Sequence, residues 1–166
     1  MSSFNRRALL GWALCGGATA VSGCFRPMLA EGSSETRLRG KIALPKSDGR
    51  FEYHLSKSLK DRLGTPSSTE WSLEVTTKIG KQEFAVAQDN SVTRITLTAT
   101  SNWTLRKRST GEVLLNEVAF SQSGYSATTS LFATRQTELD LERRLARDIG
   151  ERISRRIYAN AEVLLT

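Results

Sequence analysis

Residues 141–157 read LERRLARDIGERISRRI, and this stretch determines how the rest of the chain can pack. An apolar residue returns at every fourth position, which places five side chains in one row along a helix: Leu141, Leu145, Ile149, Ile153 and Ile157. Acidic residues lie in the N-terminal part of the segment and arginines at its end, as the helix dipole favours. We expect one long helix from about Phe132 to Asn160, with its apolar row packed on a sheet.

The charged residues of this helix are spaced for pairing. Side chains of opposite charge stand four residues apart in three places: Asp140 and Arg144, Asp148 and Arg152, Glu151 and Arg155. Pairs at this spacing lie on neighbouring turns and stabilise a helix. We therefore expect the seven arginines between residues 135 and 156 to form a solvated, paired face and not a surface that reads nucleic acid.

Upstream of this helix the apolar period changes from four residues to two. Apolar and polar residues alternate from Trp71 to Ile79 and again from Thr93 to Arg106, which is typical of antiparallel strands with one wet face. A third strand is expected from Glu112 to Tyr125, where apolar residues fall on both faces. We expect a helix to cover one face and neighbouring side chains the other; the alternative is a surface for a partner.

A shorter amphipathic helix precedes the strands. Apolar residues recur every four positions from Phe51 to Leu63, and Gly64 suits the position just after a helix end. Lys41–Leu44 is a candidate short strand. Together these elements predict an α+β fold, a two-layer sandwich in which a mainly antiparallel four-stranded sheet packs against two helices, the C-terminal one long.

The composition is that of a globular protein of single-domain length. Of its 166 residues 39% are apolar and 25% charged. The longest apolar run is about a dozen residues, shorter than the ~20 needed to cross a bilayer, so no transmembrane helix is expected. The net charge of +7 admits phosphate-bearing partners such as nucleic acid, anionic lipid or lipopolysaccharide, and does not choose among them.

The first 23 residues predict an export signal. Arg6 and Arg7 precede an apolar segment at positions 8–21, and this order is typical of secretory signals. The end of that segment, Val21–Cys24, resembles the bacterial lipobox, in which the cysteine receives lipid. We expect cleavage before Cys24 and lipidation of Cys24. The arginine pair also fits a twin-arginine signal, so both export routes stay open.

The sequence predicts a signal peptide (1–23), a lipid-anchored tether (24–39) and a single α/β domain (40–166). Residues 25–39 contain proline, glycine and serine with little periodicity, as a tether would. Phe25 follows the cysteine, whereas an Asp at that position resembles an inner-membrane retention signal in bacterial lipoproteins. We therefore expect the outer membrane as the destination, with the acyl chains as the anchor.

Groups suited to catalysis are sparse in this sequence. Cys15 would leave with the signal and Cys24 would carry lipid, so no thiol is left, and His54 is the single histidine. A zinc site needs more ligands than this. The sequence also lacks a Gly-x-Ser-x-Gly motif and a phosphate-binding glycine loop. We expect no enzyme, no metal site and no cofactor beyond the covalent lipid.

One basic cluster stands out between the second and third long strands. Arg106, Lys107 and Arg108 come together before Ser109–Gly111, which predicts a positively charged hairpin tip. Three cations at a turn suit a phosphorylated glycolipid head group. A solvated turn is the alternative interpretation of the same residues.

The order of these features resembles that of the lipopolysaccharide-assembly lipoprotein family, LptE. Four segments carry the resemblance: Gly23–Met28 (GCFRPM), Ser123–Tyr125, Leu131–Ala133 and Asp140–Ile153.

The resemblance implies a non-enzymatic lipoprotein of the outer membrane. It would sit as a plug inside the β-barrel translocon LptD, assist the assembly of that barrel and contact lipopolysaccharide on its way to the outer leaflet. Arg106, Lys107 and Arg108 are our own candidates for that contact, taken from the hairpin. The alternative function is a periplasm-facing lipoprotein of another lipid-transport system, which would need an apolar cavity for acyl chains.

Overall fold

The computed structural model describes residues 32–86, 92–126 and 130–165, and the signal sequence and Cys24 lie outside them. None of the described helices is long and apolar enough to cross a membrane. The elements follow one another as α2 (Ser34–Leu38), β1 (Ile42–Ala43), α3 (Arg50–Leu63), β2 (Trp71–Val86), β3 (Val92–Lys107), β4 (Val113–Ser126), α4 (Leu131–Ala159) and α5 (Ala161–Leu164).

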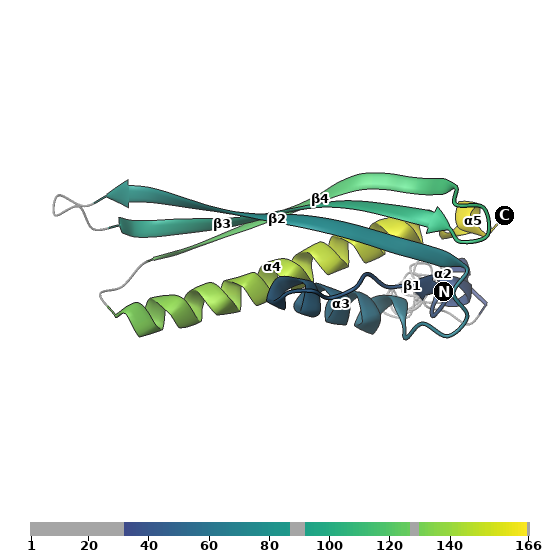
Figure 1. Cartoon of the computed structure of the whole chain (residues 1–166), viewed down its shortest axis with the longest axis horizontal. Helices are drawn as coiled ribbons and strands as arrows, with labels where there is room; N and C mark the ends of the chain where they lie inside the picture. Colours follow the sequence, from purple (N-terminus) through teal and green to yellow (C-terminus); the bar gives the residue numbers. More distant parts are fainter. Residues whose placement is uncertain (1–31, 87–91, 127–129, 166) are drawn as a thin grey trace, which may run out of the picture.

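The strands form one sheet in the order β1-β2-β3-β4. β2, β3 and β4 are antiparallel neighbours, whereas the two-residue β1 pairs in parallel with β2, with Ile42 opposite Trp71. α3 and α4 lie together on one face of this sheet, so the domain has two layers (Figure 1). The predicted α+β sandwich with a long C-terminal helix is confirmed.

α4 runs along the sheet and supplies much of the core. Its first turn is capped by Ser130, whose Oγ accepts a hydrogen bond from the Ala133 amide at 3.3 Å. The predicted apolar row is at most 6% exposed at every position: Leu141, Leu145, Ile149, Ile153 and Ile157. The helix bounds differ from the predicted ones by a single residue at each end, because the apolar period that predicted the helix also buries it.

α3 packs against α4 at a point where only glycine fits without a shift. A Cβ atom built on Gly150 would lie 2.7 Å from Oγ of Ser58 and 2.9 Å from its Cβ, well inside normal contact. Ser58 is itself buried, and its Oγ donates a hydrogen bond to the Arg147 carbonyl at 3.3 Å. Gly64 ends α3 with φ +87°, as its predicted place after the helix requires.

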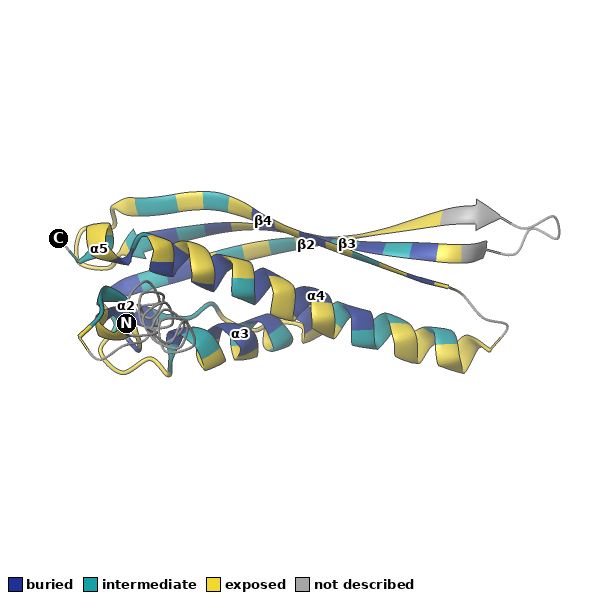
Figure 2. Cartoon of the chain, turned by 180° about the vertical axis from the view of Figure 1, so that it is seen from behind, coloured by how far each residue is buried: buried dark blue, intermediate teal, exposed yellow. Residues whose placement is uncertain are grey.

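The two faces of the sheet differ in burial. The helices cover one face of the sheet (Figure 2). Along β3 every second residue is buried, which assigns these residues to the covered face: Ile95, Leu97, Ala99, Ser101, Trp103 and Leu105. The residues between them are mainly threonines, which leaves a polar outer face. The apolar positions predicted along this strand are therefore the buried ones, and the polar positions between them lie on the outer face.

β4 corrects one expectation. Its outer face carries Val118 and Phe120, which are 61% and 49% exposed, while Ala119 between them is buried. Their cross-strand partners are Asn102 and Thr100, whose short polar side chains do not cover them. The prediction that neighbouring side chains would cover this face was wrong, because in the described part of the chain the helices lie on one side of the sheet only.

The segment predicted as a tether contains a short helix. Residues 34–38 form α2, with Ser33 as its N-cap, and Leu38 at its end is fully buried in the core. The chain is then held by a hydrogen bond from the Gly40 amide to the Leu63 carbonyl at 2.8 Å. Packed structure thus begins inside residues 24–39; a single helical turn is too short to produce a recognisable apolar period.

Candidate functional site

The structure separates the three basic residues predicted at the hairpin. Arg106 and Lys107 are the last residues of β3, and successive residues of a strand point to opposite faces. Arg106 is held by Glu74, with Nε and Oε2 3.5 Å apart. Lys107 and Arg108 instead line a pocket at the end of the sheet. The predicted cluster of three is therefore a pair in a pocket and one residue outside it.

The hairpin is tied to the rest of this end of the domain. The Lys107 amide donates to the Glu112 carbonyl at 2.9 Å and the Gly111 amide to the Lys107 carbonyl at 2.8 Å, which closes the turn. Gly111 takes φ +74°, a conformation that favours glycine. Arg108 is fixed twice, because its amide donates to the Glu70 carbonyl at 2.9 Å and its guanidinium to Thr69 Oγ1. The turn that carries the basic side chains is thus held in place by hydrogen bonds.

The end pocket, as we call it, has a volume of about 460 Å³ and forms where separate parts of the chain meet. α2, the residue before β1, the start of β2, the β3–β4 turn and the C-terminal residues all contribute, and they lie at one end of the domain (Figure 1). Its lining consists of Arg37, Lys41, Thr69, Glu70, Trp71, Lys107, Arg108, Ser109, Leu164 and Leu165.

Charge in the end pocket is mainly positive. Its lining holds four cations, Arg37, Lys41, Lys107 and Arg108, against one carboxylate, Glu70. Lys41 Nζ lies 2.7 Å from Glu70 Oε1, so this pair accounts for one charge of each sign. Within the described residues the other three cations enter no ion pair. The pocket therefore carries excess positive charge that is available to an anionic ligand.

Trp71 adds a second kind of group to the end pocket. The residue is 3% exposed, and its indole Nε1 is buried with no acceptor among the described residues. Lys41 Nζ lies 6.0 Å from its ring centroid, at the outer limit of a cation–π contact. A buried N–H without an acceptor costs free energy.

Sequence reasoning found half of the cations in this pocket. Lys107 and Arg108 were visible because they are adjacent in the chain. Arg37 and Lys41 were missed, since they reach the site only through α2 and the parallel pairing of β1 with β2. Two residues of parallel pairing leave no periodic signal, so nothing in the sequence connects residue 41 to residue 71.

The arginines of α4 largely behave as predicted. Arg144 Nε lies 2.9 Å from Asp140 Oδ2, and Arg155 lies 3.9 Å from Glu151. Asp148 differs, because it accepts a hydrogen bond from Ser121 of β4 at 3.2 Å. Arg156 also reaches β4, where its Nε lies 2.7 Å from Glu117 Oε1. Several of these charged side chains therefore form pairs within α4, and others connect α4 to β4 of the sheet.

The fold is shared with solved bacterial lipoproteins of low sequence identity. A Caulobacter crescentus protein described as a lipoprotein has a TM-score of 0.61 and 17% identity, over 78% of this chain and 96% of that one. A minor lipoprotein from Acinetobacter baumannii has a TM-score of 0.57 and 21% identity, over 74% and 94%. The rare lipoprotein B from Shewanella oneidensis has a TM-score of 0.59 and 14% identity, over 75% and 97%.

A family model gives the more specific result. No curated protein matches the sequence. The model of the lipopolysaccharide-assembly family LptE, however, matches residues 40–157, most of the chain and nearly the whole described domain. The chain therefore belongs to the lipopolysaccharide-assembly family LptE.

Proposed function

We propose that this protein is a lipoprotein of the outer membrane, anchored through Cys24, that plugs the LptD β-barrel, assists its assembly and contacts lipopolysaccharide during delivery to the outer leaflet. Membership of the LptE family supports the role in lipopolysaccharide assembly. The protein acts without enzymatic chemistry and without a cofactor other than its lipid. The localisation is the periplasmic side of the membrane and the lumen of the barrel.

The end pocket is the observation that carries the proposed lipopolysaccharide contact. Arg37 of α2, Lys107 at the end of β3 and Arg108 of the following turn line it, and none of the three forms an ion pair with a described residue. Phosphate groups of a glycolipid accept charge-assisted hydrogen bonds from such side chains, and arginine can donate two at once. Leu164 and Leu165 add apolar surface at the same place, as an amphiphilic ligand requires.

The position of the end pocket also supports this proposal. α2 begins at Ser34, ten residues after Cys24, and its Arg37 lines the pocket. A chain of that length spans at most about 36 Å when fully extended. A lipid on Cys24 would therefore keep the pocket close to the membrane from which a lipopolysaccharide molecule is handed on.

The elongated shape of the domain suits a plug. β2 and β3 each have 16 residues, which corresponds to a strand of roughly 50 Å. The outer face of β3 is mainly threonine, and Val118 and Phe120 on β4 are exposed beside it. A long, mostly polar surface with a few apolar contacts fits the water-lined interior of a large barrel.

Purification of the intact complex tests the partner. The full-length protein is extracted in mild detergent, purified by a C-terminal tag, and its partners are identified by mass spectrometry. We expect a large β-barrel of the LptD type, together with lipopolysaccharide. A permease in place of the barrel would contradict the plug and favour the other lipid-transport system.

Lipidation is tested separately with Cys24→Ala. The variant should lose incorporation of labelled palmitate and should leave the detergent phase in a partitioning assay, because the acyl chains supply the membrane affinity. Cys15→Ala is the matched control and should be labelled like the wild type. Full labelling of Cys24→Ala would show that the anchor is elsewhere.

A further inference from the structure

A second cavity lies on the helix layer and shares no residue with the end pocket. Its volume is about 480 Å³, within the range of small-molecule sites. α3 provides one wall and α4 the other. We call it the interhelix groove, lined by Tyr53, His54, Lys57, Ser58, Asp61, Arg62, Arg143 and Arg147.

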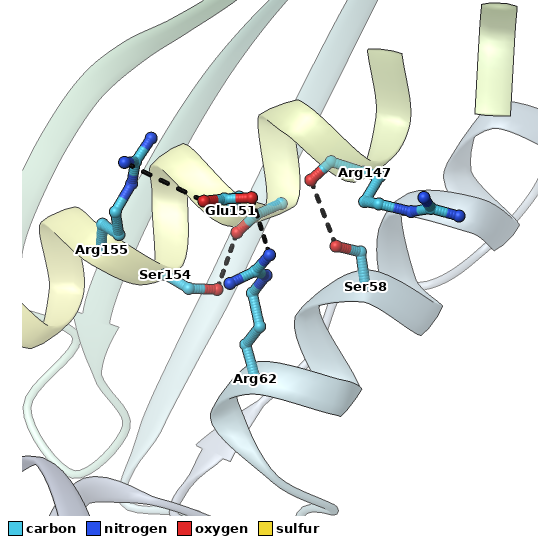
Figure 3. A network of polar contacts seen from close by, with 7 residues as sticks. Ser58, Arg62, Arg147, Glu151, Ser154 and Arg155 are labelled. Atoms are coloured by element: carbon cyan, nitrogen blue, oxygen red, sulfur yellow. Dashed lines mark hydrogen bonds and ion pairs between the residues drawn. The ribbon is translucent and has the colours of Figure 1, made fainter. Parts of the chain in front are cut away.

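The walls of this groove are held in place by a close contact between the two helices. Gly150 lets α3 approach α4, and Ser58 Oγ donates to the Arg147 carbonyl at 3.3 Å (Figure 3). Arg143 and Arg147 are four residues apart, so both stand on the same side of α4. The backbone that carries these two arginines is therefore fixed by packing and not by a charge partner in the groove.

Two of the four cations that line the interhelix groove form no ion pair with any described residue. Arg62 is occupied, since its Nη2 lies 2.7 Å from Glu151 Oε2. Arg143 forms an ion pair with Asp140 at 3.7 Å, and Asp140 does not line the groove. Lys57 and Arg147 enter no ion pair within the described residues, and the Arg147 guanidinium lies apart from the Arg62–Glu151 pair (Figure 3). Against these three cations the described lining has one carboxylate, Asp61.

His54 reports the positive potential of the groove. Its ring contacts Tyr53 edge to face, with centroids 5.4 Å apart. Desolvation lowers the pKa of His54, and so do the cations Arg143, Arg50 and Lys57, while Glu142 acts in the opposite direction. Neighbouring cations on both helices thus disfavour a further positive charge here, and the same field favours an anion.

We infer that the interhelix groove binds a phosphate-bearing group, held by Arg143 and Arg147 on α4 and by Lys57 on α3. Two arginines one turn apart offer several N–H donors to the oxygens of a phosphomonoester or a diphosphate, and lysine adds a point charge. Three cations against one carboxylate suit a ligand with more than one negative charge. This site is separate from the end pocket and does not rest on the proposed function.

The single histidine makes a clean reporter for this site. The full-length chain is purified in neutral detergent with a tag that contains no histidine, and the pKa of His54 is measured by NMR with and without pyrophosphate. Bound phosphate should raise this pKa in a saturable way, because an anion favours the imidazolium. Chloride at equal ionic strength should produce a smaller, non-saturable change, because it only screens the charges.

Two matched variants assign the effect to the groove. Arg143→Gln with Arg147→Gln removes two charged donors, so pyrophosphate should bind at least about tenfold more weakly. Lys107→Gln with Arg108→Gln, in the end pocket, should leave the response of His54 unchanged. A His54 pKa that does not respond to pyrophosphate, or responds as it does to chloride, would overturn the inference. So would an unchanged response in the α4 double variant.

Vesicle flotation then distinguishes free phosphate from a lipid head group. Vesicles of phosphatidylcholine with phosphatidylglycerol are compared with pure phosphatidylcholine. The proteins compared are Cys24→Ala, which has no acyl anchor to bind vesicles by itself, and Cys24→Ala combined with the α4 double substitution. Weaker flotation of the α4 variant on anionic vesicles would identify a lipid head group as the source. Equal flotation, together with a saturable pyrophosphate effect on His54, would identify a soluble phosphate compound, and both results support the site.

Discussion

The two ends of the domain bury apolar side chains to different extents. At the end that carries α2 and α5, Ile157 and Tyr158 of α4 are buried, and the Tyr158 hydroxyl donates to the Arg62 carbonyl at 2.7 Å. At the opposite end, Leu131 and Phe132 of the same helix are 87% and 76% exposed. Ile79, on the helix side of β2, is also 45% exposed. Burial along α4 therefore depends on what packs beside it.

This difference indicates separate roles for the two ends. The end near the predicted anchor has additional short helices, buried residues and a fixed pocket. The opposite end keeps large apolar side chains in solvent, which costs free energy unless a partner covers them. Under the proposed function, that open end is where the barrel wall would cover apolar surface. Four predictions test this difference between packed and open regions of the domain, beginning with the largest expected effect.

The largest effect is expected in the packed part of α4. Ile149→Ala should lower the free energy of unfolding by about 2–5 kcal/mol, because Ile149 is fully buried and truncation leaves a cavity. Leu131→Ala should change it by no more than about 0.5 kcal/mol, since its side chain is in solvent. Urea denaturation followed by circular dichroism measures both. Similar losses for both variants would refute the contrast between the two ends.

The next effect concerns the contact between the helices. Gly150→Ala should destabilise by about 1–3 kcal/mol, because the new methyl group would press on Ser58. In a Ser58→Gly background the same change should cost less, since the atoms it meets are gone. A double-mutant cycle from the same denaturation curves gives the coupling. Equal costs in both backgrounds would mean that the helices separate freely at this point.

A binding effect is expected at the end pocket. Lys107→Ser with Arg108→Ser should weaken lipopolysaccharide binding by about tenfold or more, because two charged donors are lost. The affinity of this variant for lipopolysaccharide should also fall less steeply with rising salt concentration than that of the wild type. Arg106→Ser is the matched control, because Arg106 is paired with Glu74 outside the pocket and should change affinity by no more than about twofold. Equal losses of affinity for both variants would mean that Arg106 contributes to lipopolysaccharide binding together with Lys107 and Arg108.

The sequence predicted those parts of the fold that depend on local periodicity. The row from Leu141 to Ile157 predicted α4 to within one residue at each end, and the alternation along β3 predicted which side chains face the helices. Both patterns repeat over several turns or strand residues, so a single irregular position does not hide them. Burial of this kind is visible because each segment carries its own pattern.

The sequence did not predict contacts between distant short segments. α2 has five residues and β1 has two, so neither is long enough to establish a period. Arg37 and Lys41 therefore could not be assigned to the same pocket as Arg108. The apolar residues of β4 were misplaced for a related reason, because alternation specifies two faces and not which of them a helix covers. Site residues held by such contacts need the three-dimensional structure.

The smallest effect expected is a dependence of stability on pH. Desolvation and the nearby Arg143 lower the folded-state pKa of His54 below its usual value of 6.5. Above both pKa values neither state binds the proton, and stability does not depend on this group. As the pH falls below about 6.5 the unfolded chain binds the proton before the folded chain does, so stability is lost down through the folded-state pKa. His54→Gln should remove this part of the loss.

Urea denaturation between about pH 7.5 and pH 5 compares the two proteins, and the variant should lose less stability than the wild type. Parallel losses would mean that the carboxylates alone set the dependence and that the groove places no net positive potential on His54.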